Sequence, residues 1–172
     1  AIRPLPFEPL KITERVVAGE REIVVDASTT LPGYFGTMKI AVTAGRDFSD
    51  DDMTHSRPVA LVDADFARAA WPGREPVGQT LRLRRGAKDA APLTVVGVVN
   101  HVRGESLRAG GKPQIYLPYH AYPLFDMSVV VRTTGDPLAV AGTARHAIES
   151  LGGLRPVHTV RTMDQYVADT MA

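Results

Sequence analysis

Short runs of β-branched and aliphatic residues, each bounded by proline or glycine, limit what this chain of 172 residues can fold into. The runs at 22–29 (EIVVDAST), 58–63 (PVALVD) and 93–99 (LTVVGVV) have the length and composition of strands. The run at 58–63 is continuously apolar over four residues, which indicates a strand buried on both faces. We therefore expect a fold organised around a β-sheet.

Two further strands are predicted from weaker patterns. Apolar and polar residues alternate at 79–84, as in a strand with one solvated face. In the strand at 115–119, Pro118 indicates an edge position, because proline cannot donate to a hydrogen-bond ladder. Residues 86–92 are expected to form a hairpin loop, and the prolines within 1–12 favour an extended lead-in without a regular helix or a central strand.

One helix is predicted directly after the run at 58–63. Asp63 occupies an N-cap position, and an apolar helix face from Phe66 to Trp71 ends at Pro72-Gly73. A shorter helical turn is expected within 31–38, followed by a polar turn at 44–53. Phe66 and Trp71 are interpreted as packing residues of the helix face and not as a stacking platform for bases.

The last third of the chain predicts a β-α-β unit and a final helix. Strands are expected at 127–133 and 157–161, around a helix that begins at Asp136-Pro137 and ends at Gly152-Gly153. Residues 162–165 fit a capping box that begins the final helix. The apolar face of the middle helix repeats at helical spacing through Leu138, Ala141, Ala144, Ile148 and Leu151. Taken together, these elements predict a mixed α+β protein.

The composition excludes several functional classes. The 20 Lys and Arg residues balance 19 Asp and Glu residues, which argues against a nucleic-acid-binding protein. The absence of cysteine excludes disulfides, thiolate zinc sites, iron–sulfur clusters and cysteine nucleophiles. No apolar run approaches the roughly 18 residues that a membrane-spanning helix needs.

The run Asp50-Asp51-Asp52 with His55 is the first candidate metal site, because carboxylates and imidazole are metal ligands. Its spacing matches neither a calcium loop nor a zinc-binding helix. The favoured interpretation is a solvated first helical turn, in which acidic residues complement the helix dipole.

His101, Glu105 and Ser106 form the second candidate, a Ser/His/Glu arrangement. A nucleophile elbow needs glycines two residues before and two residues after the serine. Gly104 supplies the first, but Arg108 stands at the second position, so a loop is favoured. The cations Arg82, Arg84 and Arg85 are interpreted as a solvated strand face. We therefore predict no catalytic residue, no cofactor and no metal site.

Several stretches, in this order, resemble the MacB-like periplasmic core domain of FtsX-like ABC transporter permeases, especially the duplicated-permease branch of acidobacteria. They are LPGYFGTMKI (31–40), AGRDFSDDD (44–52), RPVALVDADFARAAWPGREPVGQTLRL (57–83), LTVVGVVNHVRGESL (93–107), PQIYLPY (113–119), MSVVVRTTGDP (127–137) and RTMDQYVADTMA (161–172). The resemblance covers nearly the whole chain from about residue 23.

The resemblance implies an α+β fold with a porter-like β-α-β layer and an inserted, mixed α/β subdomain. Residues 1–53 and 123–172 would form the porter-like part, with its first β-α unit partly missing, and 54–122 the inserted part. Phe35 and Trp71 would anchor the two parts. An unpaired sheet edge left by a missing strand would recruit a partner strand, so a strand-paired homodimer is expected.

The resemblance further implies the extracytoplasmic, periplasmic domain of an inner-membrane permease. Such a domain is not an enzyme; it transmits the ATP-driven motion of membrane helices to molecules outside the membrane, as in export or efflux. The implied partners are a cytoplasmic ATPase subunit, a second permease copy, and a periplasmic adaptor or substrate protein. The alternatives are a stand-alone periplasmic ligand-binding protein and a hydrolase that uses His101 and Glu105.

Overall fold

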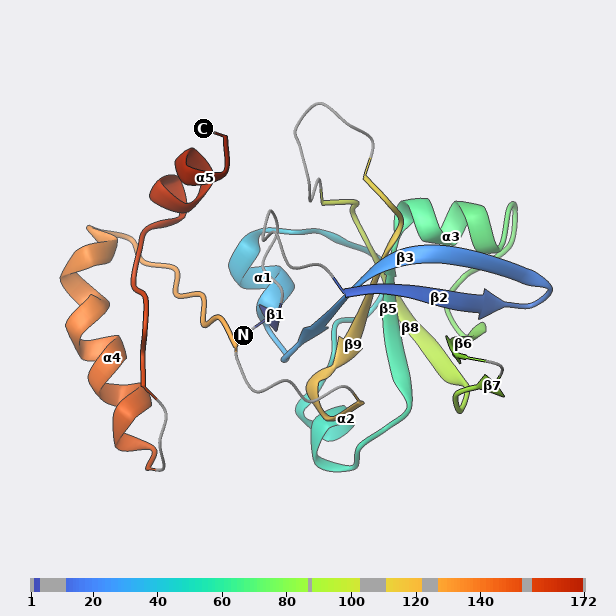
Figure 1. The fold of residues 1–172 in the computed structure, drawn as a ribbon, viewed down its shortest axis with the longest axis horizontal. Helices are drawn as coiled ribbons and strands as arrows, with labels where there is room; N and C mark the ends of the chain where they lie inside the picture. The colour runs from blue at the N-terminus through green and yellow to red at the C-terminus, as the bar shows by residue number, and fades with distance from the viewer. Residues whose placement is uncertain are drawn as a thin grey trace. The chain divides into compact units, whose positions relative to one another are not determined.

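The computed structural model describes residues 2–3, 12–86, 88–102, 111–121, 127–152 and 156–171 (Figure 1). The chain divides into two compact units, Ala1–Val130 and Val131–Ala172. Strands and helices both contribute, so the predicted α+β class is confirmed. The proposed division into 1–53 with 123–172, and 54–122, stays a prediction.

The described residues of the first unit contain nine strands, three α-helices and one 3₁₀ turn. The strands are β1 (Ile2–Arg3), β2 (Ile12–Ala18), β3 (Arg21–Thr30), β4 (Val42–Gly45), β5 (Val59–Asp63), β6 (Thr80–Arg85), β7 (Lys88–Asp89), β8 (Leu93–Val99) and β9 (Gln114–Pro118). The helical elements are α1 (Tyr34–Met38), α2 (Asp50–Thr54), α3 (Ala64–Ala70) and η1 (Tyr119–Ala121). The predicted strands at 22–29, 58–63, 79–84 and 93–99 and the predicted helix after Asp63 are thereby confirmed.

Six of these strands form a closed ring of hydrogen-bonded pairs. The order runs β8-β5-β9-β3-β2-β6, and β6 pairs again with β8. Thr94 of β8 lies opposite Val59 of β5 and also opposite Thr80 of β6, so β8 is paired on both edges. The β5–β8 and β3–β9 pairs are parallel, and the other pairs of the ring are antiparallel. The ring is therefore a small β-barrel, which removes most free strand edges.

The main hydrophobic core draws at least two residues from each strand of the ring, in pairs two positions apart, and Val98 of β8 is a third residue from that strand. The pairs are Val16 and Ala18, Val25 and Ala27, Ala60 and Val62, Leu81 and Leu83, Leu93 and Val95, and Ile115 and Leu117. This period of two is that of side chains on one face of a strand. Helix α3 adds Phe66, and its C-cap residue Trp71 packs beside it, with the two rings edge to face and their centroids 5.6 Å apart. The interpretation of these two aromatic residues as packing residues is confirmed.

A second apolar cluster covers the outer face of the central strands. It contains Val59 and Leu61 of β5, which alternate with the inward-facing Ala60 and Val62, together with Phe35 of α1. The ring of Phe35 packs edge to face on Tyr116 of β9, with centroids 4.9 Å apart. All five residues of β5 are therefore buried, as its continuous apolar run predicts.

One strand prediction in this unit needs correction, and one strand was not predicted at all. Strand β9 is not at an edge but lies between β5 and β3, because Ile115 pairs with both Val62 and Ala27. Pro118 is compatible with this place because its missing N–H falls on the last residue of the strand. Strand β2 has no clear signal in the sequence, since polar and charged residues interrupt it, and it is held by β3 on one side and β6 on the other.

The expected strands at 127–133 and 157–161 are wrong, because in the described part of the chain these segments contain a single bridge residue, Ser128, and no strand. Val129 and Val131 are 54% and 53% exposed, and Val160 is 42% exposed. A segment in which apolar and polar residues alternate becomes a strand only where a second strand pairs with that segment. The β-α-β unit expected from the sequence is therefore absent from the described residues of the second unit.

The second unit contains η2 (Pro137–Val140), α4 (Ala141–Ser150) and α5 (Met163–Met171). Asp136 caps η2 by accepting a hydrogen bond from the N–H of Leu138 at 2.9 Å, as predicted. The predicted capping box also forms: the Thr162 N–H donates to Gln165 at 2.9 Å, and the Gln165 N–H donates to the Thr162 hydroxyl at 3.2 Å. Helix α4, by contrast, buries none of its residues.

The close approach of the backbone at Arg46, directly after β4, to Gly97 of β8 gives a test of the fold. A Cβ atom on Gly97 would lie 2.3 Å from the carbonyl oxygen of Arg46, so alanine does not fit without moving the backbone. We expect Gly97→Ala to lower the free energy of unfolding by about 3 kcal/mol. Gly36→Ala is the control, because nothing lies within 4 Å of its added Cβ. Urea unfolding measures both, and equal stabilities would contradict the close approach.

Candidate functional site

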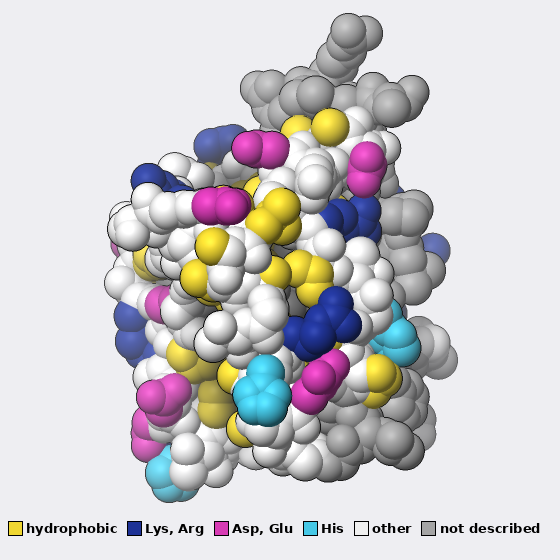
Figure 2. Space-filling model, turned by 90° about the vertical axis from the view of Figure 1, so that its left-hand side faces the viewer, with side chains coloured by type: hydrophobic (Ala, Val, Ile, Leu, Met, Phe, Trp, Pro, Cys, Tyr) yellow, Lys and Arg dark blue, Asp and Glu magenta, His cyan; other side chains and the backbone are white. Residues whose placement is uncertain are grey.

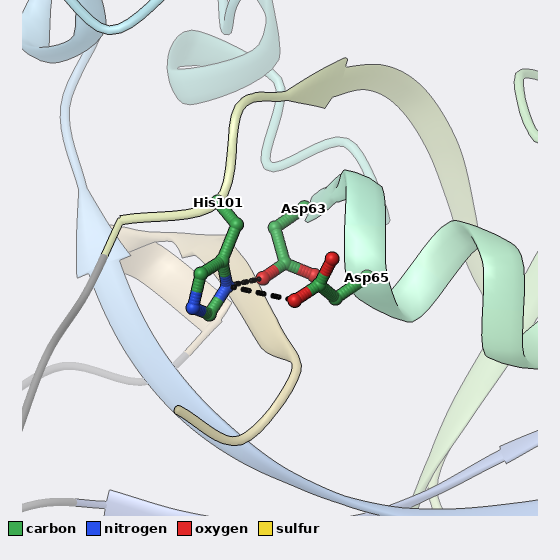
Figure 3. A group of neighbouring side chains, drawn as sticks. All are labelled: Asp63, Asp65 and His101. Carbon is green, nitrogen blue, oxygen red and sulfur yellow. Dashed lines mark hydrogen bonds and ion pairs between the residues drawn. The ribbon is translucent and has the colours of Figure 1, made fainter. Parts of the chain in front are cut away.

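Asp63, Asp65 and His101 come together at one end of the barrel (Figure 3). Asp63 is the last residue of β5, Asp65 lies in the first turn of α3, and His101 follows the end of β8 by two residues. Because β5 and β8 are parallel neighbours, their carboxyl ends meet at the same edge. The topology therefore brings together residues that are 38 positions apart.

Asp63 is the buried centre of this group, with no exposed surface. Its Oδ1 accepts a hydrogen bond from the N–H of Phe66 at 2.7 Å, which confirms the predicted N-cap. Its Oδ2 lies 2.5 Å from Nδ1 of His101. Burial raises the pKa of the Asp63 carboxyl, and hydrogen bonds from His101 and from the N–H groups of Phe66 and Gln114 oppose that rise.

Asp65 reaches the same imidazole nitrogen as Asp63 (Figure 3). Its Oδ2 is 3.6 Å from Nδ1 of His101, and its Oδ1 pairs with the guanidinium of Arg68. The side chains of Asp65 and His101 are 35% and 17% exposed, so the group opens toward solvent on the side of Asp65. One imidazole nitrogen thus faces two carboxylates, and it carries at most one proton.

A second layer of hydrogen bonds holds the chain around His101. The side-chain amide of Gln114 donates to the carbonyl of Val102 at 2.6 Å, and the Tyr116 hydroxyl donates to Gln114 at 2.8 Å. Burial raises the pKa of Tyr116 well above its usual value, so this hydroxyl keeps its proton. Residues 101 and 102 are therefore positioned by β9 as well as by β8.

Three ligand atoms of this group, one from each residue, lie within 4.8 Å of one another. Among the residues that the structure describes, it is the one group of three or more acidic or histidine side chains that gathers so closely. The arrangement can share a proton between imidazole and carboxylate, and its nitrogen and oxygen donors are ligands of divalent metal ions.

The acidic run at 50–52 forms the first turn of helix α2, which agrees with the interpretation of this run as a helix start and not as a metal site. Asp52 completes a capping box with Ser49, and both its carboxylate oxygens bind Arg46, at 2.6 and 3.0 Å. Asp51 pairs with Arg57 at 2.7 Å and with His55 at 2.9 Å. One detail differs from the expectation: Asp52 is fully buried and not solvated.

The second sequence candidate is described only in part. Glu105 and Ser106 lie outside the described residues, and the described partners of His101 are Asp63 and Asp65. The sequence pattern assigns Asp63 to the helix cap alone and gives Asp65 no role. One feature of the sequence could have brought Asp63 and His101 together. Asp63 ends one apolar strand and His101 closely follows another, and these two strands turn out to be parallel neighbours.

One cationic residue of β6, Arg84, forms ion pairs with residues of β3 and β7. Arg82 is exposed, and Arg84 lies 3.4 Å from Glu22 and 3.1 Å from Asp89. The side chain of Arg85 lies outside the described part. On the face drawn in Figure 2, Lys and Arg side chains stand singly or in small groups among acidic and apolar ones.

The known proteins that resemble this chain identify its family. A family model described as the MacB-like periplasmic core domain matches residues 7–149. The chain belongs to this family. Its expected resemblance to the MacB-like periplasmic core domain is thereby confirmed.

Two solved structures share the fold of this MacB-like domain. The periplasmic region of MacB from Actinobacillus actinomycetemcomitans is 19% identical, with a TM-score of 0.60 over 82% of this chain and 64% of that one. The extracellular domain of the noncanonic ABC-type transporter YknZ from Gram-positive bacteria is 19% identical, with a TM-score of 0.50 over 64% of this chain and 52% of that one. This chain thus spans under two thirds of the length of either structure.

No curated protein sequence matches this MacB-like domain. Within the described ranges, none of the helices is both long enough and apolar enough to cross a membrane.

The Arg46–Asp52 pair gives a pH-dependent test. The hydrogen bond from Arg46 holds the pKa of Asp52 well below its usual 3.8, so the pair stabilises the folded state at neutral pH and loses this effect as the pH falls. We expect Asp52→Asn to lower the free energy of unfolding by about 2 kcal/mol at pH 7. The stability difference between the variant and wild type should shrink by about 1 kcal/mol at pH 3. At that pH Asp52 is partly protonated in the unfolded state but stays ionised in the folded state, so wild type loses stability.

Urea unfolding followed by circular dichroism at pH 7, 5 and 3 measures this difference. Asp50→Asn in the same helical turn is the matched control, because the side chain of Asp50 is exposed. A stability difference for Asp52→Asn that stays constant from pH 7 to pH 3 would show that the carboxylate has an ordinary pKa.

Proposed function

We propose that this chain is the extracytoplasmic domain of an ABC transporter permease and that it transmits ATP-driven motion to molecules outside the membrane. Membership of the MacB-like family over residues 7–149 carries the proposal. The partners that follow are a cytoplasmic ATPase acting through membrane helices, a second permease copy, and a periplasmic adaptor or substrate protein. In this role the domain catalyses no reaction of its own.

The packing of the first unit supports a transmitting role. The ring of β8, β5, β9, β3, β2 and β6 joins its ends, so displacement of one strand is passed to its neighbours through hydrogen bonds on both edges. The core inside the ring draws on all six strands and on α3. A close-packed interior of this kind resists deformation and moves as a body.

The capped start of helix α5 also supports the proposed transmission of motion. The capping box of Thr162 and Gln165 satisfies backbone donors at the first turn, which fixes where the helix begins. Tyr166, in that first turn, is 4% exposed, and the guanidinium of Arg161 lies 5.0 Å from the centre of its ring. In the proposed mechanism, this anchored helix start transfers motion without fraying.

The proposal is tested in the full-length permease, reconstituted with its ATPase in lipid nanodiscs. A spin label at Glu20, an exposed residue of the β2–β3 turn, reports the distance between two permease copies. We expect ATP binding to shift that distance distribution. Thr162→Ala combined with Gln165→Ala should reduce the shift while ATP hydrolysis continues, because loss of the caps destabilises the helix start by about 1–2 kcal/mol.

Thr159→Ala is the matched control, since this exposed threonine precedes the capping box and takes no part in it. It should leave the ATP-induced shift unchanged. A wild-type distance distribution that is the same with and without ATP would contradict transmission through this domain. A double variant that moves as wild type does would contradict the role of α5 alone.

A further inference from the structure

We propose that Asp63, Asp65 and His101 bind one divalent metal ion of the zinc class. The three residues belong to two separate stretches of the chain, and the fold alone brings them together (Figure 3). The inference goes beyond the proposed transport role and does not depend on it.

The distances suit a metal ion after a small adjustment. Zinc binds nitrogen and oxygen ligands at about 2.0–2.1 Å, which places neighbouring ligand atoms of a tetrahedral site about 3.4 Å apart. Nδ1 of His101 and Oδ2 of Asp65 are 3.6 Å apart, close to that spacing. Nδ1 and Oδ2 of Asp63 are 2.5 Å apart, a hydrogen-bond distance that must widen by about 1 Å when an ion replaces the proton.

The surroundings determine which ligand moves. Asp63 is fixed by N–H groups from Phe66 and Gln114, and its side chain is wholly buried. His101 stands beyond the end of β8 and keeps 17% of its side chain exposed. The imidazole can therefore withdraw from Asp63 by the small amount required, while the two carboxylates stay in place.

The charges also favour a cation. Asp63 and Asp65 both face Nδ1 of His101, so with a neutral imidazole the three side chains carry two negative charges, of which the neighbouring Arg68 balances one. The guanidinium of Arg68 pairs with the other oxygen of Asp65 and leaves Oδ2 directed at the imidazole. A divalent ion between the three ligands compensates both carboxylates, and partial burial strengthens that attraction relative to water.

The donor set indicates the class of metal. One imidazole nitrogen with two carboxylate oxygens suits zinc, whereas magnesium and calcium take oxygen ligands. The hydrogen bonds on Asp63, and the Gln114 bond to the Val102 carbonyl next to His101, are the outer contacts that orient metal ligands. With three protein ligands, a fourth position remains for water.

The test is a calorimetric titration of the tag-free 172-residue chain with zinc chloride at pH 7. We expect one equivalent of zinc to bind with a dissociation constant below about 100 μM. Asp65→Asn should weaken binding at least tenfold while it leaves the Asp63 cap and the His101–Asp63 hydrogen bond intact. His101→Ala should remove binding, and magnesium chloride should bind at least tenfold more weakly than zinc.

His55→Ala is the matched control, because His55 also pairs with an aspartate, Asp51, at 2.9 Å but on the exposed surface. It should bind zinc as wild type does. Circular dichroism checks that each variant folds, and if His101→Ala does not, Asp65→Asn decides. X-ray absorption should find one imidazole and oxygen ligands at about 2.0–2.2 Å.

Three results would overturn the site. They are a wild-type dissociation constant above about 100 μM, an Asp65→Asn variant that binds as tightly as wild type, and loss of binding in His55→Ala. Because no ATP and no membrane are present, failure here leaves the proposed transport role untouched. Conversely, failure of the nanodisc experiment leaves this metal site untouched.

Discussion

The contact of β6 with β8 is the interaction on which the rest of the first unit depends. Thr80 lies opposite Thr94, and Leu81 lies opposite Leu93, and these pairs close the ring of six strands. Without these pairs, β6 and β8 would each have an open edge along the sheet. The apolar side chains that point into the ring would then be exposed to water on that side. Leu81 and Leu93 also belong to the main core, so the pairing that closes the ring buries part of the core as well.

Closure also explains why one strand can be apolar on both faces. With Ala60 and Val62 turned into the ring, Val59 and Leu61 must be covered from outside, and α1 and the residues before α2 provide that cover through Phe35 and Phe48. The carboxyl end of β5 is consequently buried as well. Asp63 stands there as a buried carboxylate that needs several donors, and His101 is one of them.

The parts of the fold that follow from local chemistry could be predicted from the sequence. The cap at Asp63, the capping box of Thr162 and Gln165, and the doubly buried run at 58–63 each depend on a few neighbouring residues. These signals work because side-chain oxygens and apolar periodicity act within one turn or one strand.

The parts that depend on distant partners could not be predicted in the same way. Strand β2 carries charged residues and exists because β3 and β6 pair with it, whereas the segment at 127–133 has a better strand pattern but no assigned strand. The meeting of His101 with Asp63 depends on β5 and β8 being parallel neighbours, and no local pattern encodes that. Asp63 was therefore readable as a cap but not as a member of a cluster.

The cap and the cluster make different demands on the same carboxylate. A cap requires Oδ1 toward the N–H of Phe66, and the cluster uses Oδ2 toward His101, so both can be met at once. An ion held at Oδ2 would stabilise the folded state by an amount that grows with the logarithm of its concentration, without touching the β6–β8 closure. In the proposed transport role, motion of the barrel as a body would rest on that closure and on the core within it. Metal binding at the proposed site would therefore change the stability of one end of the barrel and leave unchanged the strand pairing that makes the barrel rigid.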